Sequence, residues 1–187
     1  MNLDEEKISA QKNFERIVSD MPSWLAKKED KFSEKLIRSK INPIRKLESL
    51  YGVMRELYDF SARYTPCKKG CSACCHYNVT ISEVEIRFIE KYTSKKRNKQ
   101  YIPHRNFHGT PCPFLVNGAC TIYEVRPFVC RRHVALTKSN TWCQPSVSND
   151  EIFPLLNFTS IDQAYEHIRI ESKSFELVDI REVFGVI

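Results

Sequence analysis

Four of the eight cysteines in this chain lie within nine residues, in the run Cys67-x3-Cys71-x2-Cys74-Cys75. Packing does not require such a run, because a buried free thiol behaves as a small apolar side chain. Thiolates, in contrast, are soft anionic ligands that suit zinc, copper(I) and iron–sulfur clusters. The spacing therefore predicts a metal site, and four further cysteines are candidates to complete it: Cys112, Cys120, Cys130 and Cys143.

The pattern leaves the metal itself open. Zinc takes four ligands in a tetrahedron, about 2.3 Å from each sulfur, and a [4Fe–4S] cluster takes cysteines on up to four irons. We expect the cysteine loop and the second cysteine stretch to converge on a shared centre that holds Zn²⁺ or an iron–sulfur cluster. His76 and His133 stand beside cysteines and could replace one of them in a mixed site.

Such a centre would be anionic, because four thiolates outweigh the charge of one zinc ion or of an oxidised [4Fe–4S] cluster. A partly buried negative charge needs cations or hydrogen-bond donors nearby. Arg126 and Arg131 flank Cys130 in sequence, and we expect them to face the centre. Ordinary surface arginines remain the alternative.

The cysteines are expected to be reduced. The first residues of the chain do not resemble a secretory signal, so the cytoplasm is the expected location. A reducing compartment disfavours disulfides. The vicinal pair Cys74 and Cys75 would also bridge only with strain, because adjacent α-carbons lie about 3.8 Å apart, below the usual disulfide range of about 4.4–6.8 Å.

Composition limits the partners. The chain has 187 residues, 42% of them hydrophobic, and a formal net charge of +6, which suits an ordinary globular protein. The basic run Lys95-Lys96-Arg97-Asn98-Lys99 is more typical of a solvated face than of a nucleic-acid site. No apolar run is long enough to span a bilayer. The expected partner is therefore a metal ion or cluster, with a protein partner left open and neither nucleic acid nor membrane.

The elements that must position the cysteines are predicted to be mainly α-helices with one small β-hairpin, around an irregular cysteine-rich core. Residues 3–63 show helical periodicity, interrupted at Pro22, and Asn42-Pro43 marks the start of the strongest helix. Further helices are predicted over 82–92, 124–133, 160–173 and 179–184, with a short strand at 78–81 and a loop at 95–111. We divide the chain into an N-terminal helical segment (1–63), a cysteine-cluster domain (64–145) and a C-terminal helical tail packed on that domain (146–187).

Three local signals support these predictions. Ser82-x-x-Glu85 has the pattern of a capping box. Asn117-Gly118 between apolar runs predicts a type I′ hairpin turn, which would bring Cys112 and Cys120 near the open end of the hairpin. Gly70 stands inside the cysteine loop, where a turn around a metal would need a positive φ.

Taken together, these residues resemble the zinc- or iron-chelating cysteine-cluster family, the YkgJ-like proteins. The similarity covers about residues 65–132, with Cys143 at its outer limit, and implies ligand roles for the seven other cysteines. The metal is not fixed by the resemblance. The matching segments are Cys67-x3-Cys71-x2-Cys74-Cys75, Cys112-Pro113-Phe114-Leu115 and Gly118-x-Cys120-x-Ile122-Tyr123-Glu124-x-Arg126-Pro127-x-x-Cys130-Arg131.

Flagellin lysine N-methylases carry a similar cysteine cluster, which implies an alternative function in protein methyl transfer. The spacing Cys67-x3-Cys71-x2-Cys74 also matches radical S-adenosylmethionine enzymes and tilts the expectation slightly toward iron–sulfur. Those enzymes use large α/β barrels, however, and this chain has five glycines, mostly isolated, with no glycine-rich fingerprint. Whether the chain is an enzyme is left open, and we name no catalytic residue.

Overall fold

The structure is a computed structural model that describes residues 3–100, 106–148 and 154–185. It is mainly α-helical with two small antiparallel pairs of strands, which confirms the predicted fold class. Within these residues, no helix combines the length and apolar character needed to cross a membrane. Residues 101–105 of the predicted loop lie outside the described residues.

The N-terminal helical prediction is confirmed. Four helices follow one another as α1 (Leu3–Asp20), α2 (Ser23–Asp30), α3 (Phe32–Arg38) and α4 (Pro43–Ser61). Pro22 separates the first two helices, as expected from its missing N–H. The side chain of Asn42 caps α4 by accepting a hydrogen bond from the Arg45 amide at 3.0 Å.

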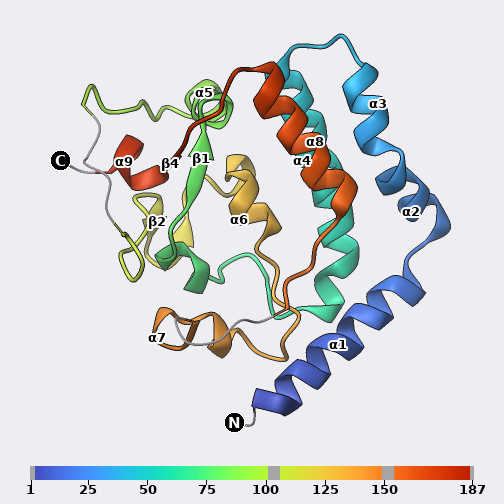
Figure 1. Ribbon diagram of the computed structural model, residues 1–187. Coiled ribbons are helices and arrows are strands. Elements are labelled where there is room, and N and C mark those ends of the chain that lie inside the picture. Colours follow the sequence, from blue (N-terminus) through green and yellow to red (C-terminus); the bar gives the residue numbers. More distant parts are fainter. Residues whose placement is uncertain (1–2, 101–105, 149–153, 186–187) are drawn as a thin grey trace.

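The main core lies where α8 (Thr159–Glu171) packs against α3 and α4. Figure 1 shows α4 and α8 side by side, with α2 and α3 along their outer edge. Leu47, Leu50 and Met54 of α4 are fully buried there, so the apolar stripe read from the sequence has a packing role. The division into three segments stays a prediction, but the C-terminal α8 packs on the N-terminal helices.

The strands extend this core toward the cysteines. The predicted strand near 78–81 is β1 (Thr80–Ser82), and it pairs antiparallel with β4 (Leu177–Asp179), which the sequence did not reveal. The predicted hairpin consists of β2 (Leu115–Val116) and β3 (Ala119–Cys120). Its turn residues Asn117 and Gly118 have φ of 51° and 73°, as a type I′ turn requires.

The helix predicted over 124–133 is shorter than expected. The segment divides into a 3₁₀ turn, η3 (Tyr123–Val125), and the helix α6 (Phe128–Arg132). Pro127 disfavours helical dihedrals at the residue before it, and Arg126 accordingly has an extended ψ of 147°. The remaining short elements are η1 (Ala62–Tyr64), η2 (Ala73–His76), η4 (Asn140–Cys143), α7 (Pro145–Ser148) and α9 (Ile180–Phe184).

Glu85 joins several of these elements. It belongs to the predicted capping box at the start of α5 (Glu83–Tyr92), where its carboxylate accepts hydrogen bonds from the amide and hydroxyl of Ser82, each at 2.8 Å. The same carboxylate accepts from Tyr51 of α4 at 3.0 Å, from the Phe128 amide of α6 at 2.7 Å and from Tyr165 of α8 at 2.5 Å. One buried side chain thus links four helices.

We predict that Glu85→Gln destabilises the protein, because an amide nitrogen would replace one accepting oxygen and face donors inside the core. Burying an unsatisfied donor lowers the free energy of unfolding by about 1–3 kcal/mol. Chemical denaturation followed by circular dichroism measures the difference. Glu176→Gln, at an exposed position, is the matched control. Equal unfolding midpoints for the two variants would show that the carboxylate does not stabilise this junction.

Candidate metal centre

The cysteine loop runs from Cys67 to η2 through a tight turn. Gly70 has a φ of 94° in this turn, as predicted. The amide of Cys71 donates to the carbonyl of Lys68 at 3.0 Å, and the amide of Cys75 donates to the carbonyl of Ser72 at 3.0 Å. These local bonds bend the chain so that all four loop cysteines lie on one compact segment.

The second cysteine stretch lies directly against this loop. The amide of Cys112 donates to the carbonyl of Cys75 at 2.8 Å, and the amide of Gly109 donates to the carbonyl of His76 at 2.7 Å. Cys120 follows on β3, where it is paired with Leu115 across the hairpin. Backbone hydrogen bonds thus hold the cysteine loop and the second cysteine stretch side by side, as expected.

The first set of neighbouring thiols consists of Cys67, Cys71 and Cys143. The sulfur of Cys67 accepts a hydrogen bond from the Ala135 amide at 3.3 Å, and the sulfur of Cys71 accepts one from the Asn140 side chain at 3.5 Å. Burial, with smaller contributions from the nearby thiols of Cys67 and Cys71 when ionised, raises the pKa of Cys143 to about 12. Cys143, the last of the sequence candidates, therefore lies beside two loop cysteines.

The second set consists of Cys75, Cys112, Cys120 and Cys130. Burial raises the pKa of Cys112 to about 12, and the thiols of Cys75 and Cys120 contribute when ionised. Burial also raises the pKa of Cys130 well above its ordinary value, with further contributions from the other three thiols of the set. Each of these four thiols therefore lies within electrostatic range of another member of the set.

Cys74 lies between the two sets. A hydrogen bond joins it to Cys75, and that bond raises the pKa of Cys74 and lowers the pKa of Cys75. Cys130 and Cys67, one from each set, also raise the pKa of Cys74. All eight thiols are free. Together these neighbours form a chain of sulfurs in which Cys74 is the link.

Of the two arginines expected to face the cysteines, Arg126 does so. Its guanidinium favours the ionised forms of Cys67, Cys75, Cys120 and Cys130. Its Nε is buried and has no hydrogen-bond partner within the described residues, although the guanidinium stacks over the Tyr123 ring at 4.1 Å. A buried unpaired donor of this kind suits a neighbouring anion.

Arg131 is placed differently. It donates to the carbonyl oxygens of Arg126 at 2.9 Å and Glu124 at 2.5 Å, and its guanidinium lies 4.1 Å from the centre of the Tyr51 ring. Burial lowers its pKa to about 10. Through these two carbonyls Arg131 supports the turn before α6.

Sequence reasoning missed Arg181, because its partners are distant along the chain. This side chain of α9 donates to the carbonyl of Cys75 at 3.1 Å and to the carbonyl of Thr110 at 2.5 Å. It also pairs with Asp179 at 3.0 Å, and its charge favours the ionised forms of Cys75 and Cys112. Arg181 therefore clamps the two cysteine stretches together.

His133 is the better placed of the two histidine candidates. Its Nε2 is buried and lacks a hydrogen-bond partner within the described residues. His133 shares a cavity of about 20 Å³ with Cys74 and Cys130, and burial lowers its pKa, which favours the neutral ring that metals bind. The backbone carbonyl of His76 accepts the Gly109 hydrogen bond.

Within residues 3–100, 106–148 and 154–185, no three Cys, His, Asp or Glu side chains are already arranged around a point that would hold a metal ion. The ligand roles of all eight cysteines therefore stay predictions. The donor chemistry still fits a thiolate-bound metal, because soft sulfur atoms lie together with a buried arginine and an unpaired imidazole.

Comparison with known proteins supports this donor chemistry. Residues 66–146 match a family model described as a putative zinc- or iron-chelating domain, named CxxCxxCC. The match is limited to this segment of the chain. No curated protein and no solved structure matches the chain. The matched residues include all eight cysteines and Arg126, whereas Arg181 lies beyond them.

We predict that Arg181→Lys loosens the contact between the two cysteine stretches. A lysine ammonium lacks the planar fork that lets Arg181 hold several carbonyls at once. Loss of about one such hydrogen bond corresponds to roughly tenfold faster amide exchange. Hydrogen–deuterium exchange of the Cys112 amide measures this change.

Arg38→Lys is the matched control for this variant, because Arg38 makes an exposed ion pair with Glu34 on α3. It should leave exchange around Cys112 unchanged. Equal protection of the Cys112 amide in the wild type and in Arg181→Lys would contradict the clamping role.

Proposed function

We propose that this chain binds metal through cysteine thiolates, as Zn²⁺ or as an iron–sulfur cluster, at two neighbouring centres. The proposal is carried by the division of the thiols into two sets of neighbours, with Cys74 between them. Cys67, Cys71 and Cys143 would serve the first centre, completed by Cys74. The second centre would use Cys75, Cys112, Cys120 and Cys130.

The charge around the cysteines supports this assignment. Four thiolates around one zinc ion leave a net negative charge, which a partly buried site must balance. Arg126 and Arg181 both favour ionised thiols in the second set. His133 is available as an alternative ligand beside Cys74 and Cys130, since its Nε2 has no hydrogen-bond partner within the described residues.

The choice of metal rests on spacing. Two sets of four cysteines suit tetrahedral zinc, whereas the three-cysteine spacing of the loop suits an iron–sulfur cluster, and we favour the cluster slightly. A reducing cytoplasm is the compartment that suits eight free thiols.

We infer a role in stabilising the fold or handling metal in preference to catalysis. The cavity that Cys74 and Cys130 share is about 20 Å³, which holds about one water molecule and not a lysine side chain. The methyl-transfer alternative therefore gains no support from this part of the site. Metal release and binding would instead involve the cysteine loop and the hairpin that lies against it.

Metal content tests the proposal. Protein purified without oxygen is expected to contain either two zinc ions per chain or iron with sulfide and a visible absorption band. The paired variants Cys71→Ser with Cys143→Ser, and Cys112→Ser with Cys120→Ser, should each lose about half of the metal, because each pair serves one centre. Elemental analysis, sulfide determination and absorption spectra give the readout.

Ser72→Ala is the control for these variants, because it changes the loop without removing a sulfur, and it should keep the full metal content. Complete metal loss in either paired variant would indicate one shared centre instead of two. A wild-type protein that takes up neither zinc nor iron after anaerobic reconstitution would overturn the proposal entirely.

Metal removal tests the structural role. Metal binding contributes folding energy in small cysteine-rich segments, so anaerobic chelation should lower the melting temperature and loosen η4. Trp142 of η4 lies beside Cys143 and is 8% exposed, whereas the other tryptophan, Trp24, is 59% exposed. In a Trp24→Phe variant, chelation should shift the fluorescence of Trp142 to longer wavelength.

The reverse variant, Trp142→Phe, reports only on Trp24 of α2 and should respond little to the chelator. An unchanged melting temperature, together with unchanged Trp142 fluorescence after confirmed metal loss, would remove the structural role while leaving metal binding intact.

A further inference from the structure

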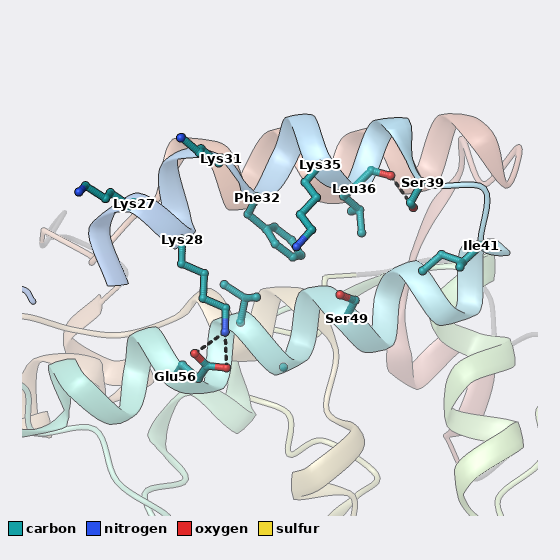
Figure 2. Close-up of a pocket in the computed structure, with 12 residues that line it drawn as sticks. Lys27, Lys28, Lys31, Phe32, Lys35, Leu36, Ser39, Ile41, Ser49 and Glu56 are labelled. Atoms are coloured by element: carbon teal, nitrogen blue, oxygen red, sulfur yellow. Dashed lines mark hydrogen bonds and ion pairs between the residues drawn. The ribbon is translucent and has the colours of Figure 1, made fainter. Parts of the chain in front are cut away.

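A groove of about 690 Å³ lies between the α2–α3 segment and α4, and no cysteine lines it. Figure 2 shows α2 and α3 forming one wall and α4 the other. Apolar side chains contribute to its lining, among them the buried Phe32, Leu36 and Val53 and the half-exposed Ile41. An open groove with this lining exposes apolar surface that a partner could cover.

The α4 wall of the groove includes a glycine, which leaves space at its position. Gly52 lines the groove, and a Cβ placed on it would meet no atom within 4 Å. Glycine within a helix is destabilising by about 1 kcal/mol relative to alanine. Neither a positive φ nor a close contact requires a glycine at this position.

Four lysines line the same groove along α2 and α3. Lys27, Lys31 and Lys35 recur every four residues and make no ion pair with any residue that the structure describes. Lys28 reaches across to α4, where it pairs with both carboxylate oxygens of Glu56 at 2.7 and 2.6 Å. Figure 2 also shows Lys35 extending toward α4. In the same view Lys27 and Lys31 extend outward from the α2–α3 segment. The unpaired positive charges are thus spread along the outer rim of this wall.

We propose that this groove binds an acidic amphipathic helix of a partner protein. The lining residues of one wall run from Lys27 to Ser39, which corresponds to about 18 Å of helix at 1.5 Å per residue. This length accommodates about three turns of a helix that lays its apolar face into the groove. Carboxylates spaced four residues apart on that helix would face Lys27, Lys31 and Lys35.

The distribution of charge favours such a helix over a fatty acid. A fatty acid carries its charge at one end, so it needs cations only at one end of a groove. The lysines here accompany the apolar lining along its length. A row of acidic side chains on a helix provides the complementary pattern, and electrostatic complementarity of this kind supplies specificity and fast association.

A designed peptide tests the proposal. The probe is an 18-residue helix with leucines at i, i+3, i+4 and i+7 and glutamates spaced four residues apart along one edge of the apolar face. We expect saturable binding to the full-length protein by fluorescence anisotropy, weakening as salt is added. A scrambled peptide of the same composition should bind at least about tenfold more weakly, because it lacks the apolar face.

Two substitutions at Gly52 separate groove binding from nonspecific charge attraction. Gly52→Leu places a side chain in the groove without changing charge and should weaken binding at least about tenfold. Gly52→Ala leaves most of the groove open and should bind within about twofold of the wild type. Circular dichroism should show that both variants keep their helical content, since a Cβ meets no clash at this position.

The lysines are tested as a set. Changing Lys27, Lys31 and Lys35 together to glutamine should weaken binding about tenfold and reduce its salt dependence. The matched control changes three exposed lysines outside the groove lining to glutamine, namely Lys12, Lys95 and Lys99. This control has the same net charge as the test variant. A difference in peptide affinity between the two variants is therefore due to the position of the lysines in the groove and not to total charge.

Three results would overturn the proposal: equal binding of the designed and scrambled peptides, wild-type affinity in Gly52→Leu, or equal weakening by both lysine triplets. Saturable binding of palmitate without binding of the peptide would also overturn it, in favour of a lipid ligand. None of these readouts depends on metal, so the outcome is independent of the function proposed for the cysteines.

Discussion

The buried carboxylate of Glu85 is the interaction on which the arrangement of this protein depends. Its two oxygens accept hydrogen bonds from Ser82, Tyr51, Tyr165 and the amide of Phe128. The side chain is 1% exposed, so water cannot replace these partners. Phe128 begins the helix that carries Cys130. Glu85 therefore fixes the position of this cysteine-bearing helix relative to the helical core.

A second constraint comes from the C-terminal part of the chain. The strand β4 pairs with β1, and α9 then places Arg181 against the carbonyls of Cys75 and Thr110. The segment that matches the family model, residues 66–146, therefore includes every cysteine but does not include the side chain that clamps the two cysteine stretches. The position of the thiols therefore depends on residues of β4 and α9, which lie far outside the cysteine motif in the sequence.

Local signals in the sequence predicted their own elements well. Asn42 caps α4, Ser82 and Glu85 form the capping box, and Asn117 begins the hairpin turn, because each of these features needs only residues close in sequence. The pairing of β1 with β4 and the role of Arg181 could not be predicted, because they depend on residues about 100 positions apart. The motif predicted which residues are candidate ligands, but not how they divide into sets.

Hydrogen bonds connect the α4 wall of the groove to the helix of Cys130. Val53 lines the groove on α4, while Tyr51, two residues earlier, donates to Glu85 and lies under the Arg131 guanidinium. Glu85 in turn accepts the amide at the start of α6, the helix of Cys130. A displacement of α4 would therefore reach Cys130 through two hydrogen bonds inside a closely packed core, where shifts are transmitted because there is little free volume to absorb them. A partner in the groove and a metal at the cysteines would thus bind to segments that Tyr51 and Glu85 connect.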